Sequence, residues 1–289
     1  MVEIKKLNPN LRVKIFAKLE GFNPGGSMKD RIALAMIEDA EKSGVLKPGK
    51  VIIDATNGNT GIGIAMVAAI KGYKAIIVCP ENINAQRRQI IEDFGAELIL
   101  VKPEIWRQGA IEMVNKMASE DPRLVVLDQF SNKESCAVHF RTTGKEIIKQ
   151  AGAPIDYFVS CVGTGGTITG IARQLKQAYP EIRVIGIQPR IWPGDSGIET
   201  GTEPIMLKDN SPCGDHNKAM VDIIVEVGEK EAKETAKRIR QEEGIFAGVS
   251  SGAALSAALR YAEKMEQGTI VTIFPDRGAN HLATEMFKV

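Results

Sequence analysis

The fold is clearest in residues 157–188, which read Tyr157-Phe-Val-Ser-Cys-Val-Gly-Thr-Gly-Gly-Thr-Ile-Thr-Gly-Ile-Ala-Arg-Gln-Leu-Lys-Gln-Ala-Tyr-Pro-Glu-Ile-Arg-Val-Ile-Gly-Ile-Gln188. The apolar run Tyr157–Cys161 predicts a buried strand, and the β-branched run Arg183–Ile187 predicts a second one. Between them, a turn rich in glycine and threonine leads into Gly166–Ala178, whose apolar residues recur with helical period. A strand, a helical crossover and another strand form the repeating unit of a parallel sheet.

The same alternation of short apolar runs and helical stretches extends over the rest of the chain. Further strands are predicted at Lys50–Ala55, Ala75–Cys79, Glu97–Val101, Leu124–Asp128, Ile223–Val227 and Thr269–Phe274. Helical stretches are predicted at Ile32–Lys42, Ile62–Ile70, Ala85–Phe94, Gly109–Ser119 and Glu229–Glu243. The sequence therefore predicts an α/β fold with parallel strands joined by helices, in which ligands bind at the carboxyl ends of the strands.

The overall composition restricts the classes of function. The 289 residues carry 37 lysines and arginines against 36 aspartates and glutamates, so neither nucleic acid nor an anionic membrane surface is an expected partner. No apolar run reaches the ~20 residues of a membrane span and no signal peptide is visible, which predicts a soluble, cytoplasmic protein. The separated cysteines and the three histidines form no disulfide framework or metal motif, so we expect no metal.

A lysine stands at the end of the turn-rich segment Glu20-Gly-Phe-Asn-Pro-Gly-Gly-Ser-Met-Lys-Asp-Arg31, just before a helical stretch. Helix N–H groups and fixed dipoles near Lys29 would disfavour its charged form. A neutral amine is what the formation of a Schiff base requires. The alternative for this segment taken alone is a solvated surface lysine, which is the more common occurrence.

Two further loops lie between a strand and a helix and are suited to bind anions. Asp54-Ala-Thr-Asn-Gly-Asn-Thr-Gly61 offers backbone N–H groups, hydroxyls and amides to a carboxylate, although an ordinary helix cap has the same composition. Gly163-Thr-Gly-Gly-Thr-Ile-Thr-Gly170 lets the backbone approach a phosphate closely and adds the hydroxyls of Thr164 and Thr167. A purely structural turn is the alternative for this second loop.

Two other enzyme classes match these loops less well. A dinucleotide-binding oxidoreductase needs a glycine where Ile168 stands and an acidic residue at the end of the next strand, which ends at Gln188. The segment Gly248-Val-Ser-Ser-Gly252 has the spacing of a serine hydrolase, with Ser250 at its centre and His281 as the downstream histidine. The oxyanion-loop features of such a hydrolase are absent. Ser250 is therefore expected either to reach into a binding site or to cap a helix.

Together and in order, these motifs resemble the cysteine synthase and cystathionine β-synthase family of pyridoxal-phosphate enzymes. The resemblance is carried by Asn23–Arg31, Thr56–Gly61, Gln129–Asn132, Gly163–Gly170 and Val249–Gly252, and it extends over nearly the whole chain. It implies two open parallel-stranded α/β/α domains with the cofactor in the cleft between them. Residues 34–136 would form a smaller mobile domain, and residues 1–33 with 137–289 a larger one.

The resemblance also implies a role for each motif. Lys29 would bind pyridoxal 5′-phosphate as a Schiff base, Asn59 would bind its ring hydroxyl, and Ser250 would face its pyridine nitrogen. The phosphate would be bound by Gly163, Thr164, Gly165, Gly166 and Thr167, and the substrate carboxylate by Thr56, Asn57, Thr60 and Gln129. The implied reaction is β-replacement on O-acetylserine or O-phosphoserine, in which sulfide adds to an aminoacrylate to give cysteine. A homodimer is implied as well.

Several features depart from the family pattern. Asn57 stands where the family usually has serine, and the glycine-rich substrate loop expected near residues 205–220 is not recognisable. The aperiodic segment Ile191–Asn217 is expected to be functional or disordered, and Arg190 and Lys208 are either ligands of a phosphate leaving group or solvated charges. The start at Met1 lacks the family's Asn-Thr-Pro-Leu segment, which suggests truncation. Cystathionine β-synthase, serine or threonine dehydratase, and a non-catalytic binding protein remain alternatives.

Overall fold

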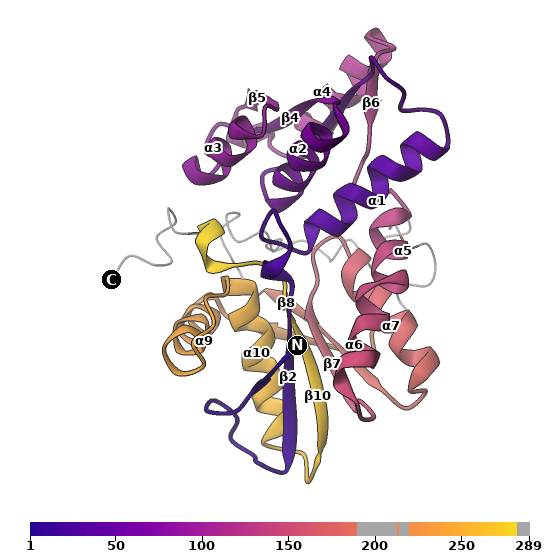
Figure 1. The fold of residues 1–289 in the computed structure, drawn as a ribbon. Coiled ribbons are helices and arrows are strands. Elements are labelled where there is room, and N and C mark those ends of the chain that lie inside the picture. The colour runs from indigo at the N-terminus through magenta and orange to yellow at the C-terminus, as the bar shows by residue number, and fades with distance from the viewer. Residues whose placement is uncertain (190–212, 214–219, 282–289) are drawn as a thin grey trace.

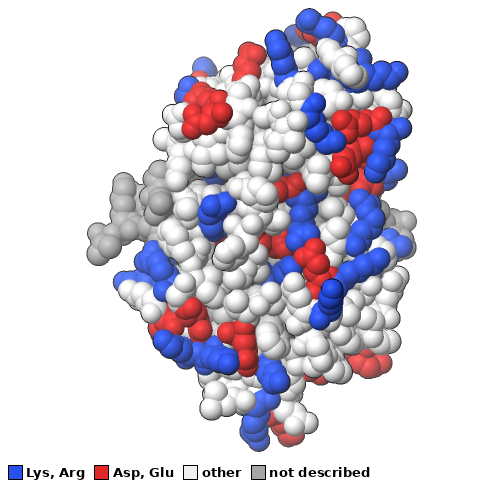
Figure 2. Space-filling model, in the orientation of Figure 1, with Lys and Arg blue, Asp and Glu red and all other residues white. Residues whose placement is uncertain are grey.

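Two separate sheets organise the computed structural model, which describes residues 1–189, 213 and 220–281 (Figure 1). Apart from Cys213, the segment 191–217 lies outside the described residues, and so does Arg190. Helices pack on both faces of each sheet, which confirms the predicted α/β fold. None of the helices in the described ranges is long and apolar enough to cross a membrane. Figure 2 shows acidic and basic side chains interspersed over the visible face of the molecule.

The larger sheet has six strands in the order β1-β2-β10-β7-β8-β9. Their bounds are Val2–Ile4 (β1), Val13–Leu19 (β2), Tyr157–Cys161 (β7), Arg183–Pro189 (β8), Ile223–Val227 (β9) and Gly268–Phe274 (β10). Strand β1 pairs antiparallel with β2, and the remaining strands are parallel. In β10, Ile270 and Phe274 enter the core on one face, whereas Val271 and Ile273 enter the core on the other. Burial on both faces requires a continuous apolar run, which makes this strand recognisable in the sequence.

The smaller sheet has four parallel strands in the order β5-β4-β3-β6. Their bounds are Val51–Ala55 (β3), Lys74–Pro80 (β4), Glu97–Val101 (β5) and Leu124–Val126 (β6). Here too the two faces are both buried, because Ile52 packs into one apolar cluster and its neighbour Ile53 into another. The two sheets therefore form two three-layered units.

Helices cover all four sheet faces (Figure 1). The α-helices of the described chain are α1 (Lys29–Lys42), α2 (Asn59–Lys71), α3 (Ala85–Asp93), α4 (Gln108–Glu120), α5 (Glu134–Arg141), α6 (Thr143–Ala151), α7 (Gly166–Ala178), α9 (Glu229–Glu242) and α10 (Val249–Ala262). On the larger sheet, α9 and α10 pack on one face and α6 and α7 on the other. On the smaller sheet, α1, α2 and α3 pack on one face and α4 on the other. Helix α5 packs against both α1 and α7 and so joins the two units.

The predicted elements agree with the structure to within a few residues, but the structure adds elements and begins one helix earlier. Strands β1 and β2 and helices α5 and α6 are additions that the sequence patterns did not indicate. Strand β2 includes Lys18, a charged residue that is only 6% exposed, because its ammonium group pairs with Glu146 at 2.6 Å. Helix α1 begins at Lys29 instead of Ile32, since the hydroxyl of Ser27 accepts the Lys29 N–H at 3.1 Å and supports an earlier first turn.

A partly buried group of ion pairs fixes the start of α1. Arg31 Nε contacts Glu20 Oε2 at 2.7 Å, and Arg31 Nη1 contacts Glu146 Oε1 at 2.8 Å. Lys18 Nζ contacts the other carboxylate oxygen of Glu146. Because these side chains come from β2, the 3-10 turn after it, α1 and α6, the pairs attach the helix that carries Lys29 to the larger unit.

Candidate functional site

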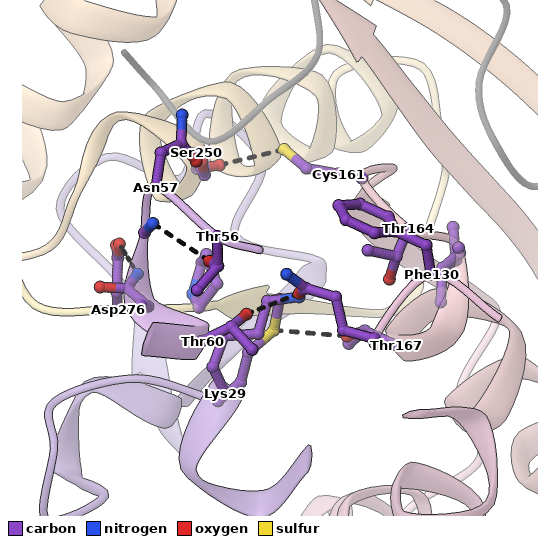
Figure 3. Close-up of a pocket in the computed structure, with 18 of the residues that line it drawn as sticks. Lys29, Thr56, Asn57, Thr60, Phe130, Cys161, Thr164, Thr167, Ser250 and Asp276 are labelled. Atoms are coloured by element: carbon purple, nitrogen blue, oxygen red, sulfur yellow. Dashed lines mark hydrogen bonds between the residues drawn. The ribbon is translucent and has the colours of Figure 1, made fainter. Parts of the chain in front are cut away.

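A cavity of about 380 Å³ lies where the carboxyl ends of both sheets meet, and its volume is typical of small-molecule sites (Figure 3). Residues just after four strands line it: Thr56 follows β3, Gln129 follows β6, Gly163 follows β7 and Asp276 follows β10. The strand-end rule for parallel sheets therefore locates the site. Within the described ranges, no three side chains of His, Cys, Asp or Glu are grouped as metal ligands.

Four helices begin at this cavity. Lys29 is the first residue of α1 and Asn59 the first of α2, whereas Thr167 and Ser250 lie in the first turns of α7 and α10. The N-terminus of a helix carries a partial positive charge and N–H groups without intrahelical partners. Four such ends around one cavity favour a ligand with anionic groups.

Lys29 lines the cavity, and the loop before it is fixed to the end of β10. The Met28 N–H donates to Pro275 O at 2.8 Å, and the Arg277 N–H donates to Gly26 O at 3.1 Å. Figure 3 shows the Lys29 side chain among the polar residues of the cavity. The predicted candidate lysine is thus placed by backbone contacts between segments that are about 250 residues apart in sequence.

The predicted phosphate loop follows β7 and lines the cavity with Gly163, Thr164, Gly165 and Thr167. Gly165 has φ +84°, a left-handed conformation that favours glycine. Gly166 is not among the cavity-lining residues and starts α7. A Cβ at Gly166 would lie 2.8 Å from the backbone oxygen of Ser135, so this glycine permits close packing of α7 on α5.

A fully buried histidine lies behind this loop. His139 Nε2 is 3.1 Å from Thr167 Oγ1, and its Nδ1 is 2.9 Å from Thr143 Oγ1. Burial, followed by the positive charges of Lys29 and Arg31, lowers the pKa of His139 to about 3. The imidazole is therefore neutral near neutral pH and acts as one donor and one acceptor. Sequence reasoning missed this residue, because a lone histidine in a helix has no distinguishing pattern.

The four residues predicted to bind a substrate carboxylate all line the cavity. Thr60 Oγ1 donates to Gln129 Oε1 at 2.6 Å, although the two residues come from α2 and from the segment after β6. Thr56 Oγ1 accepts the Gly58 N–H at 3.3 Å, which closes the turn that contains Asn57. The side-chain groups of this set are uncharged hydroxyls and amides.

Asn59 belongs to a chain of polar contacts that crosses from the smaller unit to the end of β10. Its Nδ2 donates to Asp276 Oδ2 at 2.8 Å, and its Oδ1 accepts from Asn280 Nδ2 at 3.0 Å. His281 Nε2 contacts the same Asp276 oxygen at 2.7 Å, and Arg87 Nη2 donates to His281 Nδ1 at 3.2 Å. Burial opposes the charge on Asp276, but His281, Asn59 and Arg87 together lower its pKa below the ordinary value.

Sequence reasoning did not select Asp276 or Arg87. A polar residue two positions after a predicted buried strand was a usable signal for Asp276, because β10 ends at Phe274. No sequence signal indicates Arg87, which reaches the site from α3. His281 was considered only for a serine hydrolase. Its Nδ1 accepts from Arg87, so the Nε2 proton is donated to Asp276, and this arrangement leaves neither nitrogen available as a base for Ser250.

Ser250 lines the cavity from the first turn of α10 (Figure 3). Its backbone oxygen accepts from Cys161 Sγ at 3.3 Å, which ties the helix to the end of β7. Burial, with a smaller contribution from Asp276, raises the pKa of the Cys161 thiol to about 12. Cys161 is therefore a protonated thiol near neutral pH and lacks the thiolate of a nucleophilic cysteine.

Comparison with known proteins relates this geometry to a family. A sequence model for the family described as pyridoxal-phosphate dependent enzyme matches residues 1–276. The chain belongs to this family. Pyridoxal phosphate is accordingly its cofactor.

Individual relatives cover almost the entire chain. A cysteine synthase of Staphylococcus aureus is 41% identical over 291 residues, which cover 100% of this chain and 94% of that relative. The crystal structure of a cysteine synthase from Entamoeba histolytica is similar with a TM-score of 0.90 and 37% identity, covering 100% of this chain and 87% of that one. The crystal structure of an O-acetylserine dependent cystathionine β-synthase from Helicobacter pylori is similar with a TM-score of 0.90 and 30% identity. The match covers 99% of this chain and 94% of that one.

The cavity residues of this family member fit pyridoxal phosphate. The left-handed Gly165, the neighbouring backbone and the start of α7 form a cradle suited to a phosphate. Lys29 supplies an amine, and the Ser250 hydroxyl can contact a ring nitrogen. The Asn59 amide nitrogen carries two N–H donors, and the contact with Asp276 uses one of them. The chemistry of this donor set therefore matches an aldehyde, a phosphate, a ring nitrogen and a ring hydroxyl.

Asp54 stands at the carboxyl end of β3, close to these loops, and is only 3% exposed. Its Oδ1 accepts the Ala55 N–H at 2.8 Å, whereas Oδ2 has no hydrogen-bond partner among the described residues. Burial, and then the nearby Asp128, raise the pKa of this carboxyl to about 7. Asp54 is therefore a carboxyl group whose ionisation opposes folding.

We expect the Asp54→Asn variant to lose less stability than the parent protein when the pH is raised. The native pKa of about 7 exceeds the unfolded value of about 4, so the native state binds more protons between these pH values. The free energy of unfolding of the parent therefore falls as the pH rises through this window, by up to about 4 kcal/mol from this group. Urea unfolding of the parent and the variant at about pH 5 and about pH 8 measures the difference. The exposed Asp93→Asn serves as control, and equal pH dependence of all three proteins would contradict the prediction.

Proposed function

We propose that this enzyme catalyses β-replacement on an O-activated L-serine, with sulfide as the nucleophile and L-cysteine as the product. The observation that carries the proposal is that Lys29, the glycine loop at 163–167 and the Thr60–Gln129 pair line one cavity. An amine, an anion cradle and a neutral carboxylate site are the parts this reaction needs. The names of the relatives in Staphylococcus aureus and Entamoeba histolytica support the same reaction.

Lys29 is proposed to hold the cofactor covalently and then to act as the base. Pyridoxal phosphate, when bound, supplies an aldehyde for amines and a ring that accepts the electron pair of the substrate Cα–H bond. Once the substrate amine has displaced it, the Lys29 amine is free to take the Cα proton. The O-substituent leaves Cβ with the electron pair of the C–O bond. Sulfide then forms the new bond at Cβ, and Lys29 returns a proton to Cα.

The remaining residues are proposed to bind and orient. Thr56, Asn57, Thr60 and Gln129 bind the substrate carboxylate, with the Thr60–Gln129 hydrogen bond fixing both side chains. Ser250, a neutral hydroxyl, leaves the ring nitrogen of the cofactor largely unprotonated. This moderates the electron withdrawal by the ring and favours loss of a β-substituent. Asn59, which is fixed by Asp276 and Asn280, binds the ring hydroxyl.

The buried His139 is proposed to orient the phosphate loop. A hydroxyl binds an anion only if its proton points at the anion, so the Thr167 O–H must be directed into the cavity. His139 Nε2 then donates its proton to Thr167 Oγ1, and Nδ1 accepts from the Thr143 hydroxyl. The lowered pKa of His139 supports a neutral ring, which this arrangement needs. Backbone N–H groups from Gly163 to Thr167 complete the proposed phosphate site.

Other reactions of the same chemistry are the main alternatives. The relative in Helicobacter pylori is a cystathionine β-synthase that depends on O-acetylserine, so homocysteine is the second nucleophile to test. A serine or threonine dehydratase would release a keto acid without any nucleophile. A dinucleotide-binding oxidoreductase is not favoured, because Ile168 interrupts its glycine spacing and β8 continues past Gln188 to Pro189 without an acidic end.

Product analysis of the purified protein loaded with pyridoxal phosphate tests the proposal. We expect cysteine from sulfide and at least one of O-acetylserine and O-phosphoserine, and little keto acid when the nucleophile is omitted. Chromatography of derivatised amino acids measures cysteine and cystathionine, and a coupled dehydrogenase assay measures the keto acid. Keto acid as the main product from unmodified serine would instead identify a dehydratase. Formation of cystathionine in preference to cysteine would identify homocysteine as the nucleophile.

The division into domains is proposed from the family resemblance described in the sequence analysis. Residues 34–136 are proposed to be the smaller mobile domain, and residues 1–33 with 137–289 the larger one. The four-stranded sheet, Val51 to Val126, falls within the first of these ranges. We also propose a cytoplasmic location, because the four cysteines are free thiols and suit a reducing compartment. A homodimer is proposed from the family resemblance. Light scattering of the purified protein measures its mass and tests the dimer.

A further inference from the structure

Asp276 is a buried carboxylate in the cavity wall, and within the described chain only one of its two oxygens is hydrogen-bonded. The residue is 6% exposed and lines the cavity (Figure 3). Its Oδ2 accepts from Asn59 and His281, whereas its Oδ1 has no hydrogen-bond partner among the described residues. A buried carboxylate oxygen without a partner costs free energy, so the presence of this group calls for an explanation.

The backbone beside Asp276 leaves room for its carboxylate. A Cβ at Gly248 would lie 2.3 Å from Asp276 Oδ1 and 3.0 Å from His281 Nε2. Gly248 has φ −75°, so its backbone conformation does not itself require glycine. The carboxylate can therefore occupy this position only because residue 248 has no side chain.

Asp276 decides which way round the Asn59 amide lies. An ionised carboxylate only accepts hydrogen bonds, so the amide atom that contacts it must be the nitrogen. Asn59 Nδ2 donates to Asp276 Oδ2 at 2.8 Å, and Asn59 Oδ1 accepts from Asn280 Nδ2 at 3.0 Å. Asp276 is a cavity-lining residue and Asn280 is not, so the amide nitrogen lies on the cavity side.

The charge that orients Asn59 is maintained from the other side of Asp276. His281 Nε2 contacts Asp276 Oδ2 at 2.7 Å, and Arg87 contacts His281 from α3. Burial opposes the charge on Asp276, but His281, Asn59 and Arg87 together keep its pKa below the ordinary value. Asp276 is therefore ionised near neutral pH and acts as an acceptor only.

A neutral amide in place of Asp276 would leave the orientation of Asn59 open, because two amides can pair either way round. We propose that Asp276 is a positioning residue that holds the Asn59 amide nitrogen toward the cofactor, so that Asn59 donates to the ring oxygen and favours its ionised form. The reversed amide would present its oxygen and would require the ring oxygen to keep its proton. This inference rests on the proposed contact between Asn59 and the ring hydroxyl, and it names the residue that sets the direction of that contact.

Exchange of the bound cofactor tests the direction of the amide. The full-length loaded enzyme is dialysed against a mixture of pyridoxal phosphate and its deoxy analogue, which lacks the ring hydroxyl, and the retained forms are measured by chromatography. We expect the parent to prefer pyridoxal phosphate and Asp276→Asn to lose roughly tenfold in this preference. Both forms compete for the same protein, so a general weakening of phosphate binding cancels in the ratio.

A second variant separates the direction of the amide from the charge of the site. Asp276→Asn combined with Asn280→Asp keeps the net charge but moves the carboxylate to the side where the Asn59 amide oxygen now lies. The amide should then reverse, so this double variant is expected to lose at least as much preference as Asp276→Asn alone. The visible absorption of the loaded enzyme, which reports the ionised ring oxygen, should fall in the same order. Asp93→Asn, exposed at the end of α3, is the control and should match the parent.

Asn59→Ala separates this inference from the contact on which it rests. If Asn59→Ala loses the preference while both Asp276 variants keep it, the inference is overturned and the proposed contact of Asn59 stands. If Asn59→Ala keeps the preference, the two fail together. An Asp276 variant that binds neither form shows a purely structural role and overturns the inference as well. None of these measurements uses a substrate, so a parent that forms no cysteine would refute the proposed function and leave the inference intact.

Discussion

Replacing Lys29 by alanine is expected to lower kcat for cysteine formation by roughly a thousandfold or more, because one side chain is proposed to serve both as covalent attachment and as general base. The site is otherwise expected to persist. The glycine loop and Ser250 belong to other segments, so pyridoxal phosphate should still bind through its phosphate and ring. Steady-state rates at saturating substrates measure the loss. Borohydride reduction followed by peptide mapping should place the cofactor on the Lys29 peptide of the parent only.

Lys42→Ala is the matched control for this experiment, since Lys42 is an exposed lysine at the far end of the same helix. It should retain the parent's kcat and the borohydride-stable label. Activity of Lys29→Ala above roughly a tenth of the parent's would contradict the role of Lys29. A label on another lysine of the parent would contradict it independently of any rate.

Gly170→Ala is expected to cause a large loss of stability. An added Cβ would lie 2.3 Å from the backbone oxygen of Cys136 and 2.9 Å from the Cβ of His139. Because the nearer atom is backbone, α5 and α7 must separate to make room, at a cost of about 3 kcal/mol in the free energy of unfolding. The separation should also displace His139 from Thr167 and weaken the binding of pyridoxal phosphate. Urea unfolding and titration of the visible absorption measure the two effects.

Gly228→Ala provides a matched glycine substitution. Gly228 precedes α9 with φ −76°, and no atom lies within 4 Å of the position of its added Cβ. We expect its stability to change by less than about 1 kcal/mol. If Gly170→Ala unfolds at the same urea concentration as Gly228→Ala and binds the cofactor equally well, then α5 and α7 are not in the close contact described.

The glycines of the 163–170 loop illustrate how far a motif can be interpreted. The motif correctly located a cavity-lining turn after β7 and before α7. It did not separate the glycines by role. Gly165 is needed for its positive φ, whereas Gly166 and Gly170 are needed because they lie four residues apart on the face of α7 that contacts α5. That second reason depends on a helix from another part of the chain, which no local pattern contains.

The site residues divide in the same way. Lys29, Thr60 and Ser250 were selected because each stands where a turn leads into a helix, and Thr60 also follows a predicted strand. His139 and Arg87 approach the site from behind, through α5 and α3, and their neighbours in sequence are unremarkable. Sequence thus identified groups at strand ends and missed those that support or face them from a distance.

The amino-acid sequence alone determined the fold class, the strands buried on both faces and the order of the loops that meet at the cavity. It could do so because burial on two faces and turns before helices each impose a local pattern of residue types. Only the tertiary structure decided which polar groups become partners, such as Asn59 with Asp276, 217 residues apart. A hydrogen bond depends on distance and direction, and between residues far apart in the chain these are fixed by the packing of whole sheets and helices.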